Sequence, residues 1–158
     1  MPVLMTVGEL ERFLAAEFPQ VFNPQSGLFI EAVWEHGCRV RQAFREASLR
    51  PGGTISGPTM MGLADFAMYV AVLAAIGPVP LAVTINLSVN FLRKPLQRDL
   101  TAEARLLKLG KRLATGEVTI RCLGVDGPVA HVTSTYSIPP RQPAETEDGI
   151  DGTIIPQK

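Results

Sequence analysis

The stretch GGTISGPTMMGLADFAMYVAVLAAI (52–76) decides the fold of this 158-residue chain. A turn-rich segment, RPGGTISG (50–57), precedes a proline in the order typical of a helix start, and Gly77-Pro78 follows the stretch. We therefore expect a helix from about Pro58 to Ile76. Its residues are apolar nearly all round, which predicts a helix buried by other elements. The run FAMYVAVLAAI has 11 residues, fewer than the roughly 20 of a membrane span, so we expect no membrane segment.

A single carboxylate interrupts this apolar sequence. From Pro51 through Leu92, Asp65 is the only Asp, Glu, Lys, Arg or His. Burying a charge that has neither a partner nor water costs several kcal/mol, so such a residue requires an explanation. Either Asp65 acts on a substrate, or neighbouring backbone or hydroxyl groups bind it as a structural device. Its isolation favours the functional reading.

Strand-like runs flank the central helix. An amphipathic helix (6–18) and the run GLFIEAVWEHGCRVRQAF (27–44) come before it. Gly37 interrupts this run, which indicates two extended segments or a bulged hairpin. Four runs follow: LAVTINLSVNFL (81–92), LTAEARLLKLG (100–110), ATGEVTIRCLG (114–124) and VAHVTSTYSI (129–138). This order predicts one α+β domain over residues 1–140, with an antiparallel sheet curled around the central helix. Residues 141–158 are rich in proline and acid, and we expect an irregular tail there.

Alternation in the run 81–92 predicts which side chains share a face. Thr84, Asn86, Ser88 and Asn90 alternate with apolar residues. In a regular strand these four side chains lie on one uncharged polar face.

The composition excludes several classes of function. With 15 basic and 15 acidic residues the formal net charge is zero, so no strong field directs the protein to nucleic acid or to an anionic membrane. Cys38 and Cys122 have no CxxC spacing, and we expect reduced packing cysteines. His36 and His131 lie in strand-like segments remote in sequence from Asp65, which gives a zinc site or a Ser-His-Asp triad little support, so we expect no metal. The N-terminus lacks the basic start and apolar run of a leader, and we expect a cytoplasmic protein.

Three segments carry a resemblance to a known family: SGPTMMGLAD (56–65), VTINLSVNFLRKP (83–95) and LLKLGKRLATGEV (106–118). They resemble the hotdog-fold acyl-CoA thioesterases, particularly the phenylacetyl-CoA thioesterase-like branch, over roughly residues 45–138. The resemblance implies a hotdog fold, hydrolysis of a small or medium acyl-CoA without a cofactor, and a homodimer or tetramer with sites across a two-fold interface. Asp65 matches the family's catalytic acid, and Gly57 matches a glycine whose N–H polarises the thioester carbonyl. Thr84 matches a hydroxyl residue that in some relatives positions the attacking water.

Helix geometry supports this pairing of roles. The free N–H groups and the dipole at a helix start are suited to a developing oxyanion. Gly57 and Asp65 are eight positions apart, which is roughly 12 Å of helix, too far for both to act on one carbonyl carbon. We therefore expect a second subunit to supply one of the two groups.

The chain departs from the family pattern at three positions. Ser56 stands where the family has His, Pro58 replaces a second glycine, and Arg50 falls on an upstream Asn. Proline has no N–H, but the required donor is Gly57, and Ser56 can still donate a hydrogen bond. These changes leave open a protein that binds acyl-CoA without hydrolysing it. A hotdog hydratase or dehydratase is a third reading, although its signature pairs a catalytic His with the acid, and no such pair is found.

Basic residues near strand ends are candidates for binding the phosphates of CoA. The alternative is that they are solubilising charges at hairpin ends. The resemblance favours the pair Lys111 and Arg112. The full set of candidates is Arg50, Arg93, Lys94, Lys111 and Arg112.

Overall fold

The computed structural model describes residues 2–140, so the tail expected at 141–158 lies outside the described residues. Two α-helices, a short 3-10 helix and six strands follow one another in these residues. Their bounds are α1 (Val7–Glu17), β1 (Leu28–Trp34), β2 (Gly37–Gln42), η1 (Glu46–Ser48), α2 (Gly57–Ile76), β3 (Val83–Phe91), β4 (Leu100–Leu109), β5 (Leu113–Cys122) and β6 (Ala130–Ser137).

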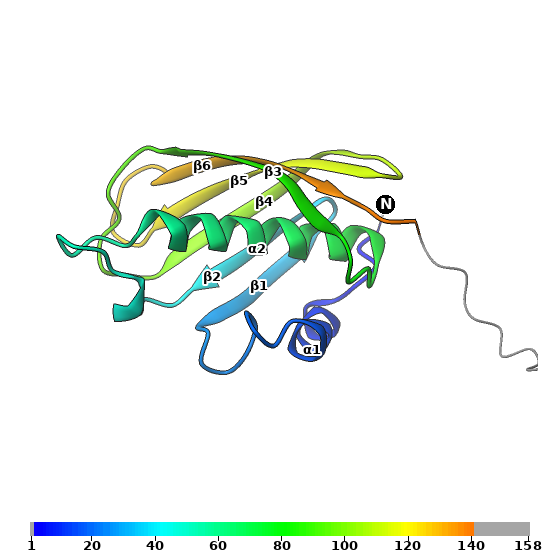
Figure 1. Cartoon of the computed structure of the whole chain (residues 1–158), viewed down its shortest axis with the longest axis horizontal. Coiled ribbons are helices and arrows are strands. Elements are labelled where there is room, and N and C mark those ends of the chain that lie inside the picture. The colour runs from blue at the N-terminus through cyan, green and yellow to red at the C-terminus, as the bar shows by residue number, and fades with distance from the viewer. Residues whose placement is uncertain (1, 141–158) are drawn as a thin grey trace, which may run out of the picture.

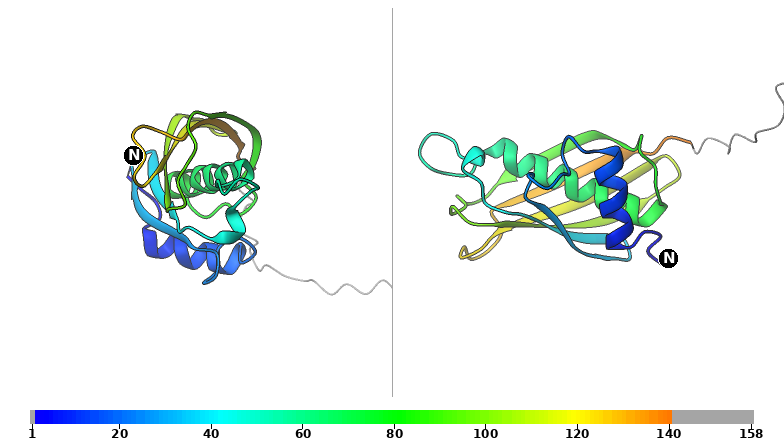
Figure 2. Two further views of the ribbon diagram at one scale, coloured as in Figure 1. Left: turned by 90° about the vertical axis from the view of Figure 1, so that its left-hand side faces the viewer. Right: turned by 90° about the horizontal axis from the view of Figure 1, so that it is seen from below.

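One antiparallel sheet curls around α2. The strand order is β1-β2-β4-β5-β6-β3, and every neighbouring pair is antiparallel. In the end-on view of Figure 2 the strands surround α2, while α1 lies outside the sheet beside β1 (Figures 1 and 2). This arrangement confirms the α+β hotdog fold expected from the sequence.

The ends of α2 follow from local sequence. Ser56 is the N-cap and its side chain accepts a hydrogen bond from the backbone of Thr59, while Gly77, with a φ of 90°, ends the helix. The helix has the length and mean hydropathy (1.8) of a membrane span, yet 67% of that stretch is buried inside the fold. It is therefore the core helix of the domain, as its all-round apolar character predicts.

The two cysteines are packing residues, as expected. Both are free and buried. The Cys38 thiol donates to the backbone oxygen of Ala67 at 3.1 Å. Burial raises the pKa of Cys38 to about 12, so its thiol stays protonated and unreactive near neutral pH.

The prediction that Thr84, Asn86, Ser88 and Asn90 share one polar face of β3 is wrong, because the strand is irregular. Its register with β6 shifts between Thr84 and Asn86, which marks a bulge at Ile85. An extra residue reverses the alternation, so Thr84 faces α2 before the bulge and Leu87 and Val89 pack against the core after it. Asn86, Ser88 and Asn90 are exposed and lie on the opposite face from Thr84.

Candidate active site

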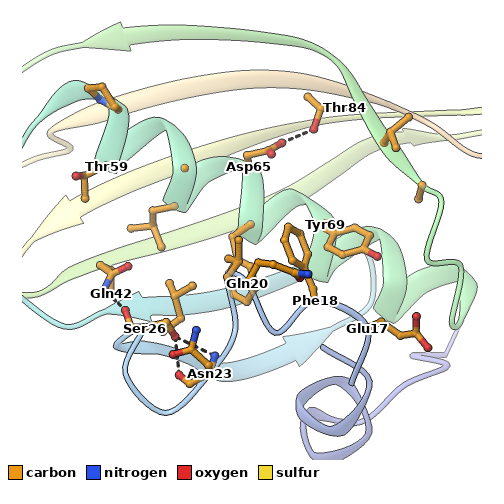
Figure 3. Close-up of a pocket in the computed structure, with 18 of the residues that line it drawn as sticks. Glu17, Phe18, Gln20, Asn23, Ser26, Gln42, Thr59, Asp65, Tyr69 and Thr84 are labelled. Carbon is orange, nitrogen blue, oxygen red and sulfur yellow. Dashed lines mark hydrogen bonds between the residues drawn. The ribbon is translucent and has the colours of Figure 1, made fainter. Parts of the chain in front are cut away.

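Asp65 lies on the face of α2 that is turned toward β3. Two hydroxyl groups bind its carboxylate: Thr84 Oγ1 donates to Oδ1 at 2.5 Å, and the Tyr136 hydroxyl donates to the same oxygen at 2.9 Å. Figure 3 shows Thr84 reaching down from β3 to Asp65. Within residues 2–140, no Lys, Arg or His forms an ion pair with Asp65. In the described residues the carboxylate is thus held by two neutral hydroxyl donors and by no basic side chain.

The second carboxylate oxygen of Asp65 is open. In the described part of the chain Oδ2 has no hydrogen-bond partner, and no buried side-chain oxygen there is left unsatisfied, so Oδ2 must reach solvent. Asp65 also lines a cleft of about 1010 Å³. A purely structural carboxylate would need neither an open oxygen nor a cleft beside it, so the geometry favours a functional Asp65.

The cleft lies between α2 and the segment that joins α1 to β1. Its apolar wall includes Phe18, Val21, Leu63, Phe66 and Tyr69, and the rings of Phe18 and Tyr69 meet edge to face at 6.2 Å (Figure 3). The charged residues that line it are Glu17, Arg45 and Asp65. An apolar wall beside a carboxylate can hold an acyl group next to the group that attacks it.

The start of α2 leaves one backbone donor open. The Ser56 side chain accepts from Thr59 N at 3.3 Å, the Ser56 carbonyl accepts from Met60 N at 3.3 Å, and Pro58 has no N–H. Among the described residues, no partner is found for the Gly57 N–H. The open N–H at the start of α2 is thus that of Gly57, the residue for which the sequence analysis expects a backbone donor.

Ser56 acts as a helix cap in this structure. Its hydroxyl lies 2.8 Å from the Thr59 hydroxyl, and Ser56 does not line the cleft. Ser56→Ala is therefore expected to lower the free energy of unfolding by about 1 kcal/mol, measured by urea denaturation. Its effect on turnover should be much smaller than that of changing Asp65.

The matched control for this change is Ser56→Asn, because Asn also caps helices. It should retain most of the stability that Ser56→Ala loses. A large loss of turnover in both variants at unchanged stability would instead give Ser56 a direct role in the reaction.

Sequence reasoning missed Tyr136. It is 71 positions from Asp65 along the chain, but Thr84 and Tyr136 are opposite each other in the β3–β6 pairing, so the register brings both hydroxyls to one carboxylate. Knowing that β3 pairs with β6 would have identified Tyr136, but the order of the strands along the chain does not reveal that pairing.

The basic candidates divide into two groups. Arg50 precedes α2, and Arg93 and Lys94 follow β3, at the end of the molecule where α2 begins (Figure 1). Lys111 and Arg112 lie in the β4–β5 turn, at the opposite end of the molecule. Leu113, which follows them, begins β5 and pairs with Ser137, the last residue of β6. All five are exposed, and none lines the cleft. One protomer therefore does not hold them in a single cluster.

The histidines lie outside the cleft. His131 Nε2 is 3.1 Å from Glu117 on the sheet, and His36 occupies the β1–β2 turn with a φ of 59°. Neither lines the cleft with Asp65. Within residues 2–140, no three His, Cys, Asp or Glu side chains gather as a metal-binding group would.

Comparison with known proteins identifies the family of this chain. The family described as the thioesterase superfamily matches residues 52–128. A solved structure from Silicibacter sp., whose name proposes a thioesterase, is 45% identical, with a TM-score of 0.79 over 87% of this chain and 94% of that one. A variant of the phenylacetic acid degradation protein PaaI from Thermus thermophilus is 26% identical, with a TM-score of 0.62 over 80% and 98% of the two chains. A Saccharolobus solfataricus protein whose name proposes an esterase is 28% identical over 116 residues, 73% of this chain and 75% of that protein. The chain belongs to the thioesterase superfamily.

Proposed function

We propose that this protein is an acyl-CoA thioesterase that hydrolyses a small or medium acyl-CoA to the free acid and CoA. The observation that carries the proposal is the open Oδ2 of Asp65 beside a cleft with an apolar wall. Membership of the thioesterase superfamily supports the reaction class. The reaction requires water and no metal or redox cofactor, and we propose that it takes place in the cytoplasm.

In the proposed reaction the thioester carbonyl accepts a hydrogen bond from the Gly57 N–H. Asp65 either attacks the carbonyl carbon, forming an anhydride that water then hydrolyses, or takes a proton from a water that attacks directly. Negative charge develops on the carbonyl oxygen, where the helix start stabilises it. The C–S bond breaks, water supplies the hydroxyl of the acid, and the remaining proton of that water passes to the sulfur, so that CoA leaves as its thiol. Thr84, which also lines the cleft, holds the Asp65 carboxylate through Oδ1.

We propose that two subunits complete each site. Along α2, Gly57 and Asp65 are separated by about 12 Å, so one carbonyl cannot contact both in the same protomer. β3 is an edge strand, and the apolar side chains on or beside it are exposed: Leu81, Val83, Ile85, Phe91 and Leu92. A long apolar edge favours pairing with another strand. A second copy of β3 would cover this edge and bring a second α2 beside the first, as a dimer or as half of a tetramer.

The same two-fold pairing would join the two basic groups. In an antiparallel pairing of β3 with its copy, the start of one strand lies beside the end of the other. The hairpin of Lys111 and Arg112 in one subunit would then approach Arg93 and Lys94 in the partner. We propose that these four residues and Arg50 bind the CoA phosphates together.

The experiment that tests the proposal is release of free thiol from a panel of acyl-CoAs, from short aliphatic to aromatic. Turnover of at least one member is expected, and calorimetry should show binding of CoA. Binding of CoA without hydrolysis of any member would favour the second reading, a protein that binds acyl-CoA and does not cleave it. If the protein shows neither turnover of any acyl-CoA nor binding of CoA, both readings are rejected.

A further inference from the structure

We infer that Tyr136 is a positioning residue that, together with Thr84, selects Oδ2 of Asp65 as the reacting oxygen. The inference rests on the proposed function, in which Asp65 attacks the thioester or activates water. Both hydroxyls donate to Oδ1, Thr84 at 2.5 Å and Tyr136 at 2.9 Å. An oxygen that accepts two hydrogen bonds has less electron density to offer an electrophile or a proton. Oδ2, which has no partner among residues 2–140, is left to react.

Tyr136 also holds the backbone of Asp65. Its hydroxyl lies 3.0 Å from the Asp65 carbonyl oxygen, so its single proton is shared between that carbonyl and Oδ1. This contact ties the third turn of α2 to β6. The side chain and the backbone of Asp65 are thus held from one point, which restricts the rotation of the carboxylate.

The position of Tyr136 is itself well defined. The side chain is buried, at 3% exposure, and its ring stacks on Tyr69 with centroids 6.1 Å apart and planes 18° apart. The Tyr69 hydroxyl in turn donates to the backbone oxygen of Pro80 at 3.1 Å. Burial, followed by the negative charge of Asp65, raises the pKa of Tyr136. Tyr136 therefore stays a neutral donor over the working pH range.

The test compares Tyr136→Phe with Ser134→Ala. Tyr136→Phe keeps the stacked ring and removes only the hydroxyl. Ser134→Ala also removes a buried hydroxyl of β6, one that donates to the Asn86 carbonyl at 3.0 Å, and Ser134 neither lines the cleft nor contacts Asp65. We expect Tyr136→Phe to lower kcat by roughly tenfold to a hundredfold with little change in KM, and Ser134→Ala to leave kcat unchanged.

A second comparison shows whether the effect passes through Asp65. In an Asp65→Asn background, Tyr136→Phe should cause little further loss, because the group it positions no longer reacts. An equal loss of kcat in the presence and absence of the Asp65 carboxylate would overturn the inference. The inference would also be overturned if Ser134→Ala lowered kcat as much as Tyr136→Phe does, with the same loss of stability in both variants.

A crystal structure of Tyr136→Phe gives a readout that does not depend on activity. We expect the Asp65 carboxylate to occupy a second rotamer or to turn away from Thr84. An unchanged single conformation with wild-type kcat would overturn the inference. If the wild-type protein hydrolyses no thioester, the proposed function fails. The conformation of Asp65 in the crystal structure of Tyr136→Phe still decides whether Tyr136 positions it.

Discussion

Asp65→Asn is expected to lower turnover by roughly 10³- to 10⁴-fold while the protein stays folded. Asn has the shape of Asp, and its amide oxygen can still accept from Thr84 and Tyr136, which donate to Oδ1 in the structure. The substitution removes the negative charge, so the side chain can neither attack a thioester nor take a proton from water. The measurement is thiol release from the best substrate of the panel, with the melting temperature recorded for each variant.

Asp99→Asn is the matched control for this change. Asp99 accepts hydrogen bonds from Arg41 Nη1 at 3.0 Å and from the backbone of Phe44 at 2.9 Å, and it does not line the cleft. This control should lose stability and keep its kcat, whereas Asp65→Asn should lose kcat and keep its stability. Wild-type turnover in Asp65→Asn would remove the carboxylate from the mechanism.

The sequence predicts the core of this fold well because one feature dominates it. The stretch from about Pro58 to Ile76 is apolar nearly all round, which predicts a core helix, and the alternating runs around it supply the sheet that buries it. The structure has this helix at Gly57–Ile76. Asp65 was identified for the same reason, since a carboxylate is conspicuous where nothing else is charged.

The details of the site depend on contacts that a linear pattern does not encode. The bulge at Ile85 reverses the alternation of β3, so Thr84 points toward Asp65 while Asn86 points away. Tyr136 joins the site only because β6 pairs with β3. A one-residue bulge and the order of strands in a sheet are set by tertiary packing, which competes with local propensity and here determines the outcome.

The position of the proline at the start of α2 allows the oxyanion donor to be tested. In the double variant Gly57→Pro with Pro58→Ala, the missing N–H moves from residue 58 to residue 57. Ser56 has φ −69° and ψ 152°, a conformation that suits the residue before a proline, and proline is favoured at the first helical position. An added Cβ would lie 3.2 Å from Phe91 Cζ, the far end of a side chain that can move. Relative to Pro58→Ala alone, we expect kcat to fall by roughly 10²- to 10³-fold.

Mixing two inactive variants then shows whether each site is shared between subunits. One subunit carries Asp65→Asn with an intact Gly57, and the other carries the double change at 57 and 58 with an intact Asp65. If each site combines Gly57 of one subunit with Asp65 of its partner, a heterodimer has one intact site and should regain about half of the wild-type turnover per dimer. The heterodimer can be purified through two different affinity tags and assayed beside each parent. No recovery, in a heterodimer that melts like its parents, would contradict a site shared between Gly57 of one subunit and Asp65 of its partner.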